Sequence, residues 1–331
     1  MNYKSFMGID VSKLTLDVYI YHKKQKQQFT NDFKGYQLLC KWLKENLHHD
    51  LKEALICFEH TGLYSMNLAV FLQKSAVPFV IVPALAIKRS LGITRGKIDQ
   101  IDAQRIGEYA YLKRENLQPT VLPSSTICKL KPLLALRDRL VVNRAGYKAS
   151  YKEQKLFFAT KEHALLFATY QQLIKESTKK IVAFEEEIQN LLETDEEMKQ
   201  TFHLITGIKG IGPLTAAYFI ASTHNFNRFS SWRQFACYSG TAPFEYQSGT
   251  SIRGRSKLSH LANKHLKTLL FLSANNAARY DAELKEYYLR RLKEGKSKMS
   301  TLNIIKNKLI ARTFAVAKRQ TAYVDVRRFA M

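Results

Sequence analysis

The sequence predicts a mixed α/β region followed by a helical, basic region. Over about the first 115 residues, short apolar runs alternate with amphipathic stretches, as in a sheet covered by helices. Beyond residue 128, apolar residues recur mostly at helical spacing. We therefore expect an α/β domain first and α domains after it.

Three strands are expected at the start of the chain. Residues 5–12 (SFMGIDVS) form a nearly continuous apolar run, which is typical of a buried central strand. Residues 15–22 (TLDVYIYH) alternate apolar residues with others, as a half-buried strand does. Residues 26–33 (KQQFTNDF) give a weaker signal for a third strand.

The following segments are expected to alternate between helix and strand, as helix 35–49, strand 53–62, helix 63–75, strand 77–83 and helix 99–115. The opening strands suit an antiparallel meander, and the later alternation suits parallel pairing through crossover helices. This order outlines an RNase H-like fold. Another α/β sandwich would show the same order, so both alternatives stay open at this point.

The rest of the chain divides into two helical parts. We expect an α/β domain over 1–128, a coiled-coil or helical-hairpin arm over 129–200 and a basic, mostly helical domain over 201–331. The arm carries an a/d seam of Ile174, Ile181, Phe184, Ile188 and Leu191. The seam is short enough to pack within one chain, but a dimerisation arm is the preferred interpretation. Little strand signal is found beyond residue 201.

Charge is the strongest global signal. The net charge is +24 with a pI near 9.8, and residues 251–331 hold 19 Lys and Arg against 5 Asp and Glu. Such a surface attracts polyanions, so nucleic acid is the expected partner. No apolar run reaches the length of a membrane span, no secretory signal is evident, and the four cysteines are widely spaced. We expect a reducing bacterial cytoplasm, at the nucleoid, and no membrane.

Four carboxylates stand at the ends of predicted elements. Asp10 ends the first strand, Glu59 ends the fourth, and Asp99 and Asp102 lie three apart at a helix start. An i,i+3 pair projects from one helical face, so all four can converge. Clustered carboxylates repel unless cations lie between them, and hard oxygen ligands suit Mg²⁺ or Mn²⁺. Taken alone, each of these acids is explained at least as well by a structural role as by metal binding. Asp17, Asp32 and Asp138 are interpreted as surface residues.

Two further stretches are candidate nucleic-acid contacts. In GIKGIG (207–212), Lys209, Gly210 and Gly212 resemble a helix-hairpin-helix motif whose backbone N–H groups grip phosphates, although a plain glycine-rich connection would look the same.

The second stretch holds a candidate nucleophile. Ser248 stands in a Gly-rich loop, and Arg253, Arg255 and Lys257 follow it. A serine beside guanidinium groups can attack a phosphodiester, whereas an ordinary surface turn is the simpler explanation.

Several motifs, taken in order, resemble those of a known family. They are GIDVSK, FEHTGLY, KIDQIDAQRIGEYA, ITGIKGIGPLTA, YSGTAPFEYQSG and NKHLKTLL. Together they resemble the DEDD insertion-sequence transposases related to Piv DNA invertases, some of which are guided by a bridge RNA. The resemblance runs from about residue 5 to residue 320.

The resemblance implies a RuvC-like domain, a coiled coil and a C-terminal transposase domain. It places the four acids on Asp10, Glu59, Asp99 and Asp102, and the nucleophilic serine on Ser248, with Ser239 and Ser251 as neighbouring competitors. It implies Mg²⁺ at the acids, a covalent phosphoserine link to DNA, donor and target DNA as substrates, a noncoding bridge RNA and a dimer or tetramer. The alternatives are a RuvC-like nuclease that uses no covalent serine step, and a non-catalytic nucleic-acid-binding protein.

Overall fold

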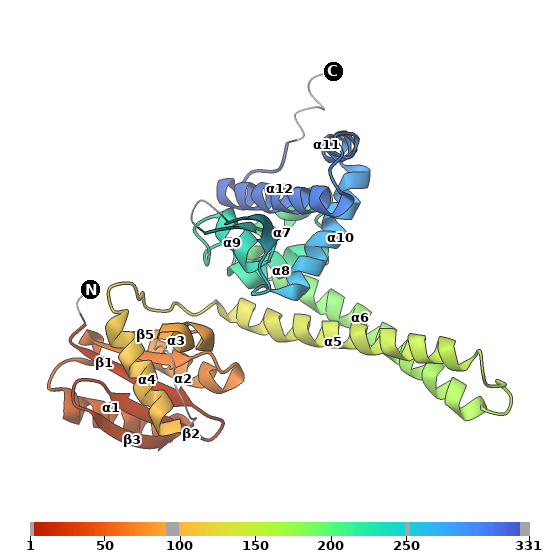
Figure 1. The fold of residues 1–331 in the computed structure, drawn as a ribbon. Helices are drawn as coiled ribbons and strands as arrows, with labels where there is room; N and C mark the ends of the chain where they lie inside the picture. The colour runs from red at the N-terminus through yellow and green to blue at the C-terminus, as the bar shows by residue number, and fades with distance from the viewer. Residues whose placement is uncertain (1–2, 91–98, 249–251, 325–331) are drawn as a thin grey trace. The chain divides into compact units, whose positions relative to one another are not determined.

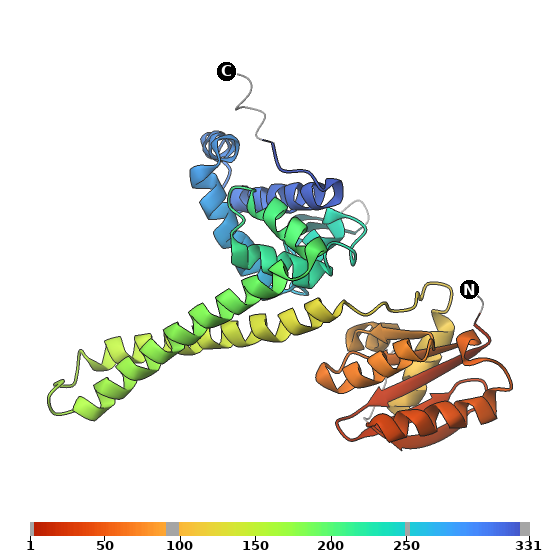
Figure 2. The same cartoon turned by 180° about the vertical axis from the view of Figure 1, so that it is seen from behind.

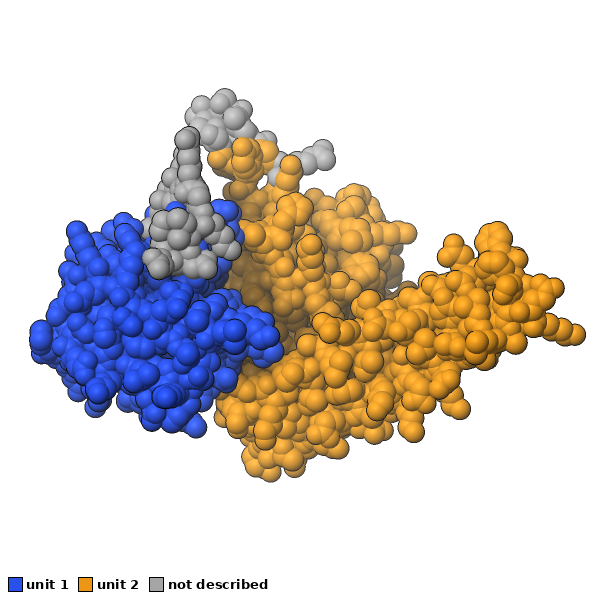
Figure 3. Space-filling view, turned by 90° about the horizontal axis from the view of Figure 1, so that it is seen from below, with its two compact units in different colours: residues 1–122 blue, residues 123–331 orange. Residues whose placement is uncertain are grey.

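The computed structural model describes residues 3–90, 99–248 and 252–324. The chain divides into two units, residues 1–122 (unit 1) and 123–331 (unit 2), which Figure 3 shows in different colours. Each unit has a hydrophobic core of its own. The two units are therefore described separately.

Unit 1 is built on a five-stranded mixed sheet with the order β3-β2-β1-β4-β5. Its strands are β1 (Ser5–Val11), β2 (Thr15–Ile20), β3 (Gln25–Thr30), β4 (Ala54–Glu59) and β5 (Phe79–Val82). The first three strands form an antiparallel meander, whereas β4 pairs parallel to β1 and β5 pairs parallel to β4. The expected strands are confirmed, including the third, which carried the weakest pattern.

Helices cover both faces of this sheet (Figure 1). On one face, α1 (Phe33–Leu47) and α2 (Leu63–Lys74) pack on the odd-numbered residues of β1, such as Met7 and Ile9. On the other face, α3 (Ala84–Ser90) and α4 (Asp99–Leu112) pack on Phe6 and on alternate residues of β4 and β5. Because side chains alternate along a strand, Gly8 and Asp10 belong to the α4 face.

Unit 2 begins with a long helical hairpin, seen in yellow and green in Figure 2. Helices α5 (Ser125–Gln154) and α6 (Ala164–Glu193) have 30 residues each, so each is about 45 Å long. They run antiparallel, since Arg137 bonds Glu185 near one end and Gln154 bonds Tyr170 near the other.

The seam predicted from the sequence is used inside this hairpin. Ile181 and Ile188 are only 3% and 4% exposed. Of the two alternatives that the sequence left open, packing within one chain is the one observed. The seam packs against α5 of the same chain, and a dimerisation arm stays a prediction.

The remainder of unit 2 packs six further helices around one core and adds a two-stranded ribbon. The elements are α7 (Glu196–Thr206), α8 (Pro213–Thr223), α9 (Trp232–Tyr238), β6 (Pro243–Ser248), β7 (Ile252–Leu258), α10 (Lys264–Tyr280), α11 (Ala282–Lys293) and α12 (Lys298–Arg319). The antiparallel pair β6–β7 corrects the expectation of little strand in this region. The described side chains of β6 are exposed, so this ribbon lacks the apolar alternation by which strands are detected.

No helix in the described ranges is long and apolar enough to cross a membrane.

Candidate functional site

A contact between two glycines sets α4 directly on the central strand. A Cβ atom placed on Gly8 would lie 2.1 Å from the carbonyl oxygen of Ala103 and 2.2 Å from the backbone nitrogen of Gly107. Only a residue without a side chain permits this approach of helix to strand. Gly8 in GIDVSK therefore fixes the turn of α4 that contains Ala103, and its neighbour Asp102, beside β1.

Asp10 and Glu59 lie near the carboxyl ends of neighbouring parallel strands, on the face that α4 covers. Glu59 is the last residue of β4, whereas Asp10 is the second-last of β1, which runs one residue further than the sequence predicted. Ile9 and Phe58 form the last pair between β1 and β4, and the two acids come directly after them. Parallel strands present their carboxyl ends at one edge of the sheet, where ligands usually bind. Both carboxylates are partly buried. The sequence prediction that these strand ends lie side by side is in agreement with this register.

The surroundings of Glu59 are apolar enough to perturb a neighbouring group. Cys57 points to the same face, two residues earlier, and is fully buried. Burial, together with the charge of Glu59, raises the pKa of the Cys57 thiol to about 12. Cys57 is therefore a protonated packing residue in this core.

Asp102 and Asp99 stand on the first turn of α4. Asp99 is the first residue of the helix, and its side chain lies outside the described part of the structure. Asp102 is partly buried, and one of its carboxylate oxygens lies 2.9 Å from a guanidinium nitrogen of Arg105. The spacing of three places both acids on one side of the helix.

The backbone places Asp10 and Glu59 at one edge of the sheet, with α4 packed on the same face. Among the described side chains, no three His, Cys, Asp or Glu are grouped so that they could hold one metal ion. The donor chemistry, carboxylate oxygens on a shared edge, nevertheless suits a hard divalent cation. The four-acid metal site therefore stays a prediction.

Asp17 belongs to this edge, although the sequence analysis interpreted it as a surface residue. It is the direct cross-strand partner of Asp10 on β2. Gln28 on β3 donates a hydrogen bond of 2.9 Å to its carboxylate. Asp17, Gln28 and Ala103 line a cavity of about 240 Å³. The hairpin register between residues 10 and 17 was the signal that could have identified it.

Two other carboxylates interpreted as surface residues also have defined roles. Asp32 caps the N-terminus of α1, where its carboxylate accepts a hydrogen bond of 2.7 Å from the N–H of Gly35. This hydrogen bond helps to lower the pKa of the Asp32 carboxyl group. Asp138 on α5 is bonded by the hydroxyl of Tyr218 and lies 3.2 Å from Nε2 of His265. Burial and this carboxylate raise the pKa of Tyr218. For Asp138 the surface interpretation is wrong, because it links α5 to α8 and α10.

Ser248 is the last residue of β6, at the tip end of the β6–β7 ribbon. Its backbone pairs with Ile252, and its side chain is outside what the structure describes, as are those of Arg253 and Arg255 on β7. Gly249 and Ser251 also fall outside the described ranges. Lys257, near the other end of β7, is exposed.

The competing serine, Ser239, is not available as a nucleophile in this structure. It is fully buried, and its hydroxyl donates to the carbonyl of Ala236 and contacts Thr241. A buried hydroxyl that is satisfied by the backbone has a structural role. This observation favours Ser248 over Ser239.

The base of the ribbon is clamped to α12, which sequence reasoning missed. Asn303 and Asn307 donate hydrogen bonds of 2.9 and 3.0 Å to the carbonyl oxygen of Thr241, and the Thr241 hydroxyl donates to Asn307 at 3.1 Å. These contacts join residues more than 60 positions apart, so no local pattern announces them.

The glycine-rich stretch joins α7 to α8, as a helix-hairpin-helix motif would. Gly210 has φ of +98°, and a Cβ there would lie 2.8 Å from Cβ of Ala277 and 2.9 Å from the carbonyl of Ser273. The turn and the close packing on α10 therefore explain why residue 210 is a glycine. Lys209 and Gly212 are exposed, and their contact with phosphate stays a prediction.

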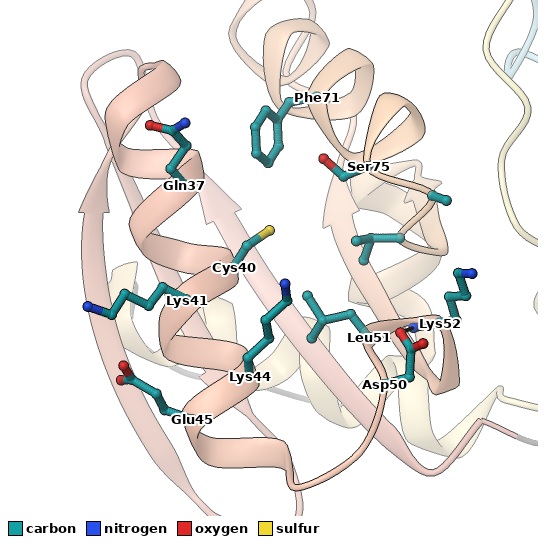
Figure 4. A pocket seen from close by; sticks show the side chains of 12 residues that line it. Gln37, Cys40, Lys41, Lys44, Glu45, Asp50, Leu51, Lys52, Phe71 and Ser75 are labelled. Carbon is teal, nitrogen blue, oxygen red and sulfur yellow. Dashed lines mark hydrogen bonds between the residues drawn. The ribbon is translucent and has the colours of Figure 1, made fainter.

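A cavity of about 480 Å³ lies between α1 and α2, and Figure 4 shows its lining residues, among them Cys40, Lys44 and Phe71. These two helices cover the face of the sheet opposite to Asp10. The cavity is therefore separate from the acidic edge.

Two family models match the chain. Residues 7–154, which contain the four acids, match the model described as Transposase, for the DEDD domain of IS110 elements. Residues 202–289, which contain Ser248, match the model described as Transposase IS116/IS110/IS902 family.

Curated relatives agree with these matches. The pilin gene-inverting protein of Moraxella bovis is 28% identical over 330 residues, covering 97% of this chain and 98% of that protein. The pilin gene-inverting protein of Moraxella lacunata has the same identity and coverage. The uncharacterized 43.6 kDa protein of insertion element IS110 from Streptomyces coelicolor is 31% identical over 120 residues, 36% of this chain and 29% of that protein. The chain therefore belongs to the family of DEDD-type IS110 transposases and Piv DNA invertases, and is an enzyme that acts as a DNA transposase or recombinase.

Proposed function

We propose that the chain cuts and rejoins DNA strands with a four-acid metal site and a serine nucleophile. The observation that carries this proposal is the placement of Asp10 and Glu59 at adjacent carboxyl ends of parallel strands, beside α4. The strand order of unit 1, a meander followed by two parallel crossovers, supports an RNase H-like fold. The Moraxella relatives are named gene-inverting proteins, and inversion requires strands to be cut and rejoined.

The acids would hold a divalent ion, which the DEDD family implies. Asp10, Glu59, Asp99 and Asp102 are the ligands in this proposal, and Mg²⁺ or Mn²⁺ fits their oxygen donors. When bound, the ion supplies positive charge at the scissile phosphate. The contact between Gly8 and α4 holds Asp102 beside the strand that carries Asp10.

Ser248 would attack the scissile phosphorus. In this step the bond from Oγ to phosphorus forms, the bond from phosphorus to the departing deoxyribose oxygen breaks, and the serine proton passes through solvent to that oxygen. One phosphate ester replaces another, so its bond energy is kept and strands can be rejoined without ATP. The exposed Lys257, and Arg253 and Arg255 on the same strand, would attract the phosphate backbone.

Donor and target DNA are the substrates in this proposal, and a noncoding bridge RNA would select them by base pairing. Base pairing would then supply the sequence specificity, while the net charge of +24 supplies attraction without specificity. A dimer or tetramer would combine the acids of one protomer with the serine of another.

Replacing Ser248 by Ala tests the covalent step. We expect Ser248→Ala to form no protein–DNA adduct on denaturing gels and to lower strand exchange at least about a thousandfold, because the nucleophile is lost. Ser256→Ala, an exposed serine on β7, is the matched control and should retain the adduct.

The alternative, a nuclease that uses metal-activated water, predicts a different result. In that case Ser248→Ala would cut DNA like the unmodified protein, and no adduct would form with either. If instead Ser251→Ala abolished the adduct and Ser248→Ala did not, the neighbouring serine would be the nucleophile.

A further inference from the structure

Three basic side chains of unit 2 meet where α8 ends beside α5. Lys131 on α5 places Nζ 3.1 Å from Nε2 of His224, the C-cap residue of α8. Arg228 follows in the loop before α9, and its charge acts on both. We refer to Lys131, His224 and Arg228 as the basic trio.

The backbone between His224 and Arg228 is strained and firmly held. His224, Asn225 and Phe226 have φ of 51°, 52° and 65°, a conformation that side-chain-bearing residues rarely adopt in succession. The N–H of Phe226 donates to the hydroxyl of Thr223 at 2.9 Å, and the N–H of Arg228 donates to the carbonyl of Thr223 at 2.8 Å. Strain of this kind persists where surrounding contacts enforce it, often at functional sites.

No carboxylate neutralises the basic trio in the ranges that the structure covers. Neither Lys131 nor Arg228 forms an ion pair there; Lys131 bonds His224, and Arg228 donates to the carbonyl of Ser222 at 3.3 Å. Glu197 of α7 reaches this turn, but it accepts a hydrogen bond of 3.0 Å from Asn225. The positive charges of the trio are therefore left without an anionic partner from these residues.

The excess of positive charge in the basic trio changes the pKa values of two of its members. Burial and the charges of Lys131 and Arg228 lower the pKa of His224 to about 4, so its imidazole is neutral at pH 7. Its Nε2 then accepts a hydrogen bond from the ammonium group of Lys131. Burial and Arg228 also lower the pKa of Lys131. Lys131 and Arg228 remain exposed enough for an anion to reach them.

Aromatic rings orient the arginine. The guanidinium carbon of Arg228 lies 5.1 Å from the ring centre of Phe229 and 4.9 Å from that of Tyr238. Nearby on α9, Arg233 lies 4.9 Å from the ring of Trp232. A guanidinium held against rings can direct N–H groups at a phosphate, in addition to the one that Arg228 donates to Ser222. Basic groups interleaved with aromatic rings are typical of nucleic-acid surfaces.

We propose that the basic trio binds a phosphodiester group of a nucleic-acid backbone, at a site separate from the acids of unit 1. Lys131 and Arg228 contact the phosphate oxygens, and the negative charge raises the pKa of His224, so that His224 takes up a proton at pH values between its free and bound pKa. Binding then strengthens as the pH falls, because the bound form holds this proton more tightly than the free form. This site rests on the proposed function in one respect, that the chain acts on nucleic acid. It requires neither the four acids nor Ser248.

Binding of labelled duplexes tests the site. Lys131→Gln and Arg228→Gln should weaken binding of a DNA or RNA duplex about threefold to tenfold in EDTA, and lower the salt dependence by about one unit each. Lys129→Gln and Arg139→Gln remove equal charge from exposed positions of α5 and are the matched controls. Weakening with only one of the two duplexes identifies the strand that occupies the site. Trio variants that bind as their controls do would overturn the proposal.

Proton titration of His224 by NMR, assigned with His224→Gln, gives a second readout. We expect the duplex to raise the pKa of His224 from about 4 toward its ordinary value. A titration unchanged by the duplex, or moved by inorganic phosphate alone, contradicts a nucleic-acid site. Asp10→Asn should bind and shift His224 normally, so loss of catalysis and loss of this site are distinguishable.

Discussion

Replacing Asp10 by Asn is expected to lower DNA strand cleavage by about 10²–10³-fold or more, because it removes one charge from the proposed metal ligands. Asn has the same shape as Asp, so the β1–β2 pairing opposite Asp17 should persist. Cleavage of a labelled donor duplex at saturating Mg²⁺, with circular dichroism to verify folding, measures the effect. Excess Mn²⁺ should restore part of the activity.

A matched control separates loss of the site from loss of charge in unit 1. Glu59→Gln should behave as Asp10→Asn does, since Glu59 ends the adjacent strand on the same face. Glu45→Gln removes an exposed carboxylate from α1, on the opposite face, and should leave cleavage unchanged. Equal activity of Asp10→Asn and Glu45→Gln would argue against the four-acid site.

The second large effect is expected from a single methyl group at Gly8. Gly8→Ala places Cβ about 2 Å from the backbone of Ala103 and Gly107, neither of which is a flexible side chain. Because α4 must then move off β1, we expect unit 1 to lose about 3 kcal/mol or more of stability, at or above the upper range for overpacking. Hydrogen exchange of β1 and α4, compared with the thermal melt, measures it.

Substitutions at two other glycines serve as comparisons for Gly8→Ala. Gly107→Ala should cost less than Gly8→Ala, because its Cβ would lie 3.1 Å from the ring of Tyr19 and 3.2 Å from the backbone nitrogen of Gly8, against about 2 Å for a Cβ on Gly8. Gly146→Ala, in the middle of α5 with nothing within 4 Å, should be neutral or stabilising by up to about 1 kcal/mol. A Gly8→Ala protein with the exchange pattern of the unmodified chain would show that this contact does not hold α4 in place.

The sequence predicted unit 1 well because its signals are local. Buried strands such as β1 and β4 are short apolar runs, and the helices between them have an apolar face, so each element is recognisable within about a dozen residues. Asp10 and Glu59 were found because each ends such a run. Asp17 was missed because its relation to Asp10 appears only when the hairpin register is known.

Unit 2 was harder to predict because its informative features are long-range or exposed. The strands β6 and β7 lie on the surface, so burial imposes no alternation on them. The seam at Ile181 and Ile188 is helical in either case, and only the partner helix decides between a hairpin and a dimer. The contacts of Asp138 with Tyr218 and His265 span 80 positions or more, beyond any sequence period.

Peptide mapping of a trapped protein–DNA complex is the most direct test of the proposed chemistry. The unmodified protein is incubated with donor DNA and Mg²⁺, denatured, digested with nuclease and protease, and analysed by mass spectrometry. We expect a nucleotide phosphate on the peptide that contains Ser248, and none in Asp10→Asn. A nucleotide on another residue, or efficient strand exchange with no covalent adduct, would contradict a serine nucleophile that works with the acids of unit 1.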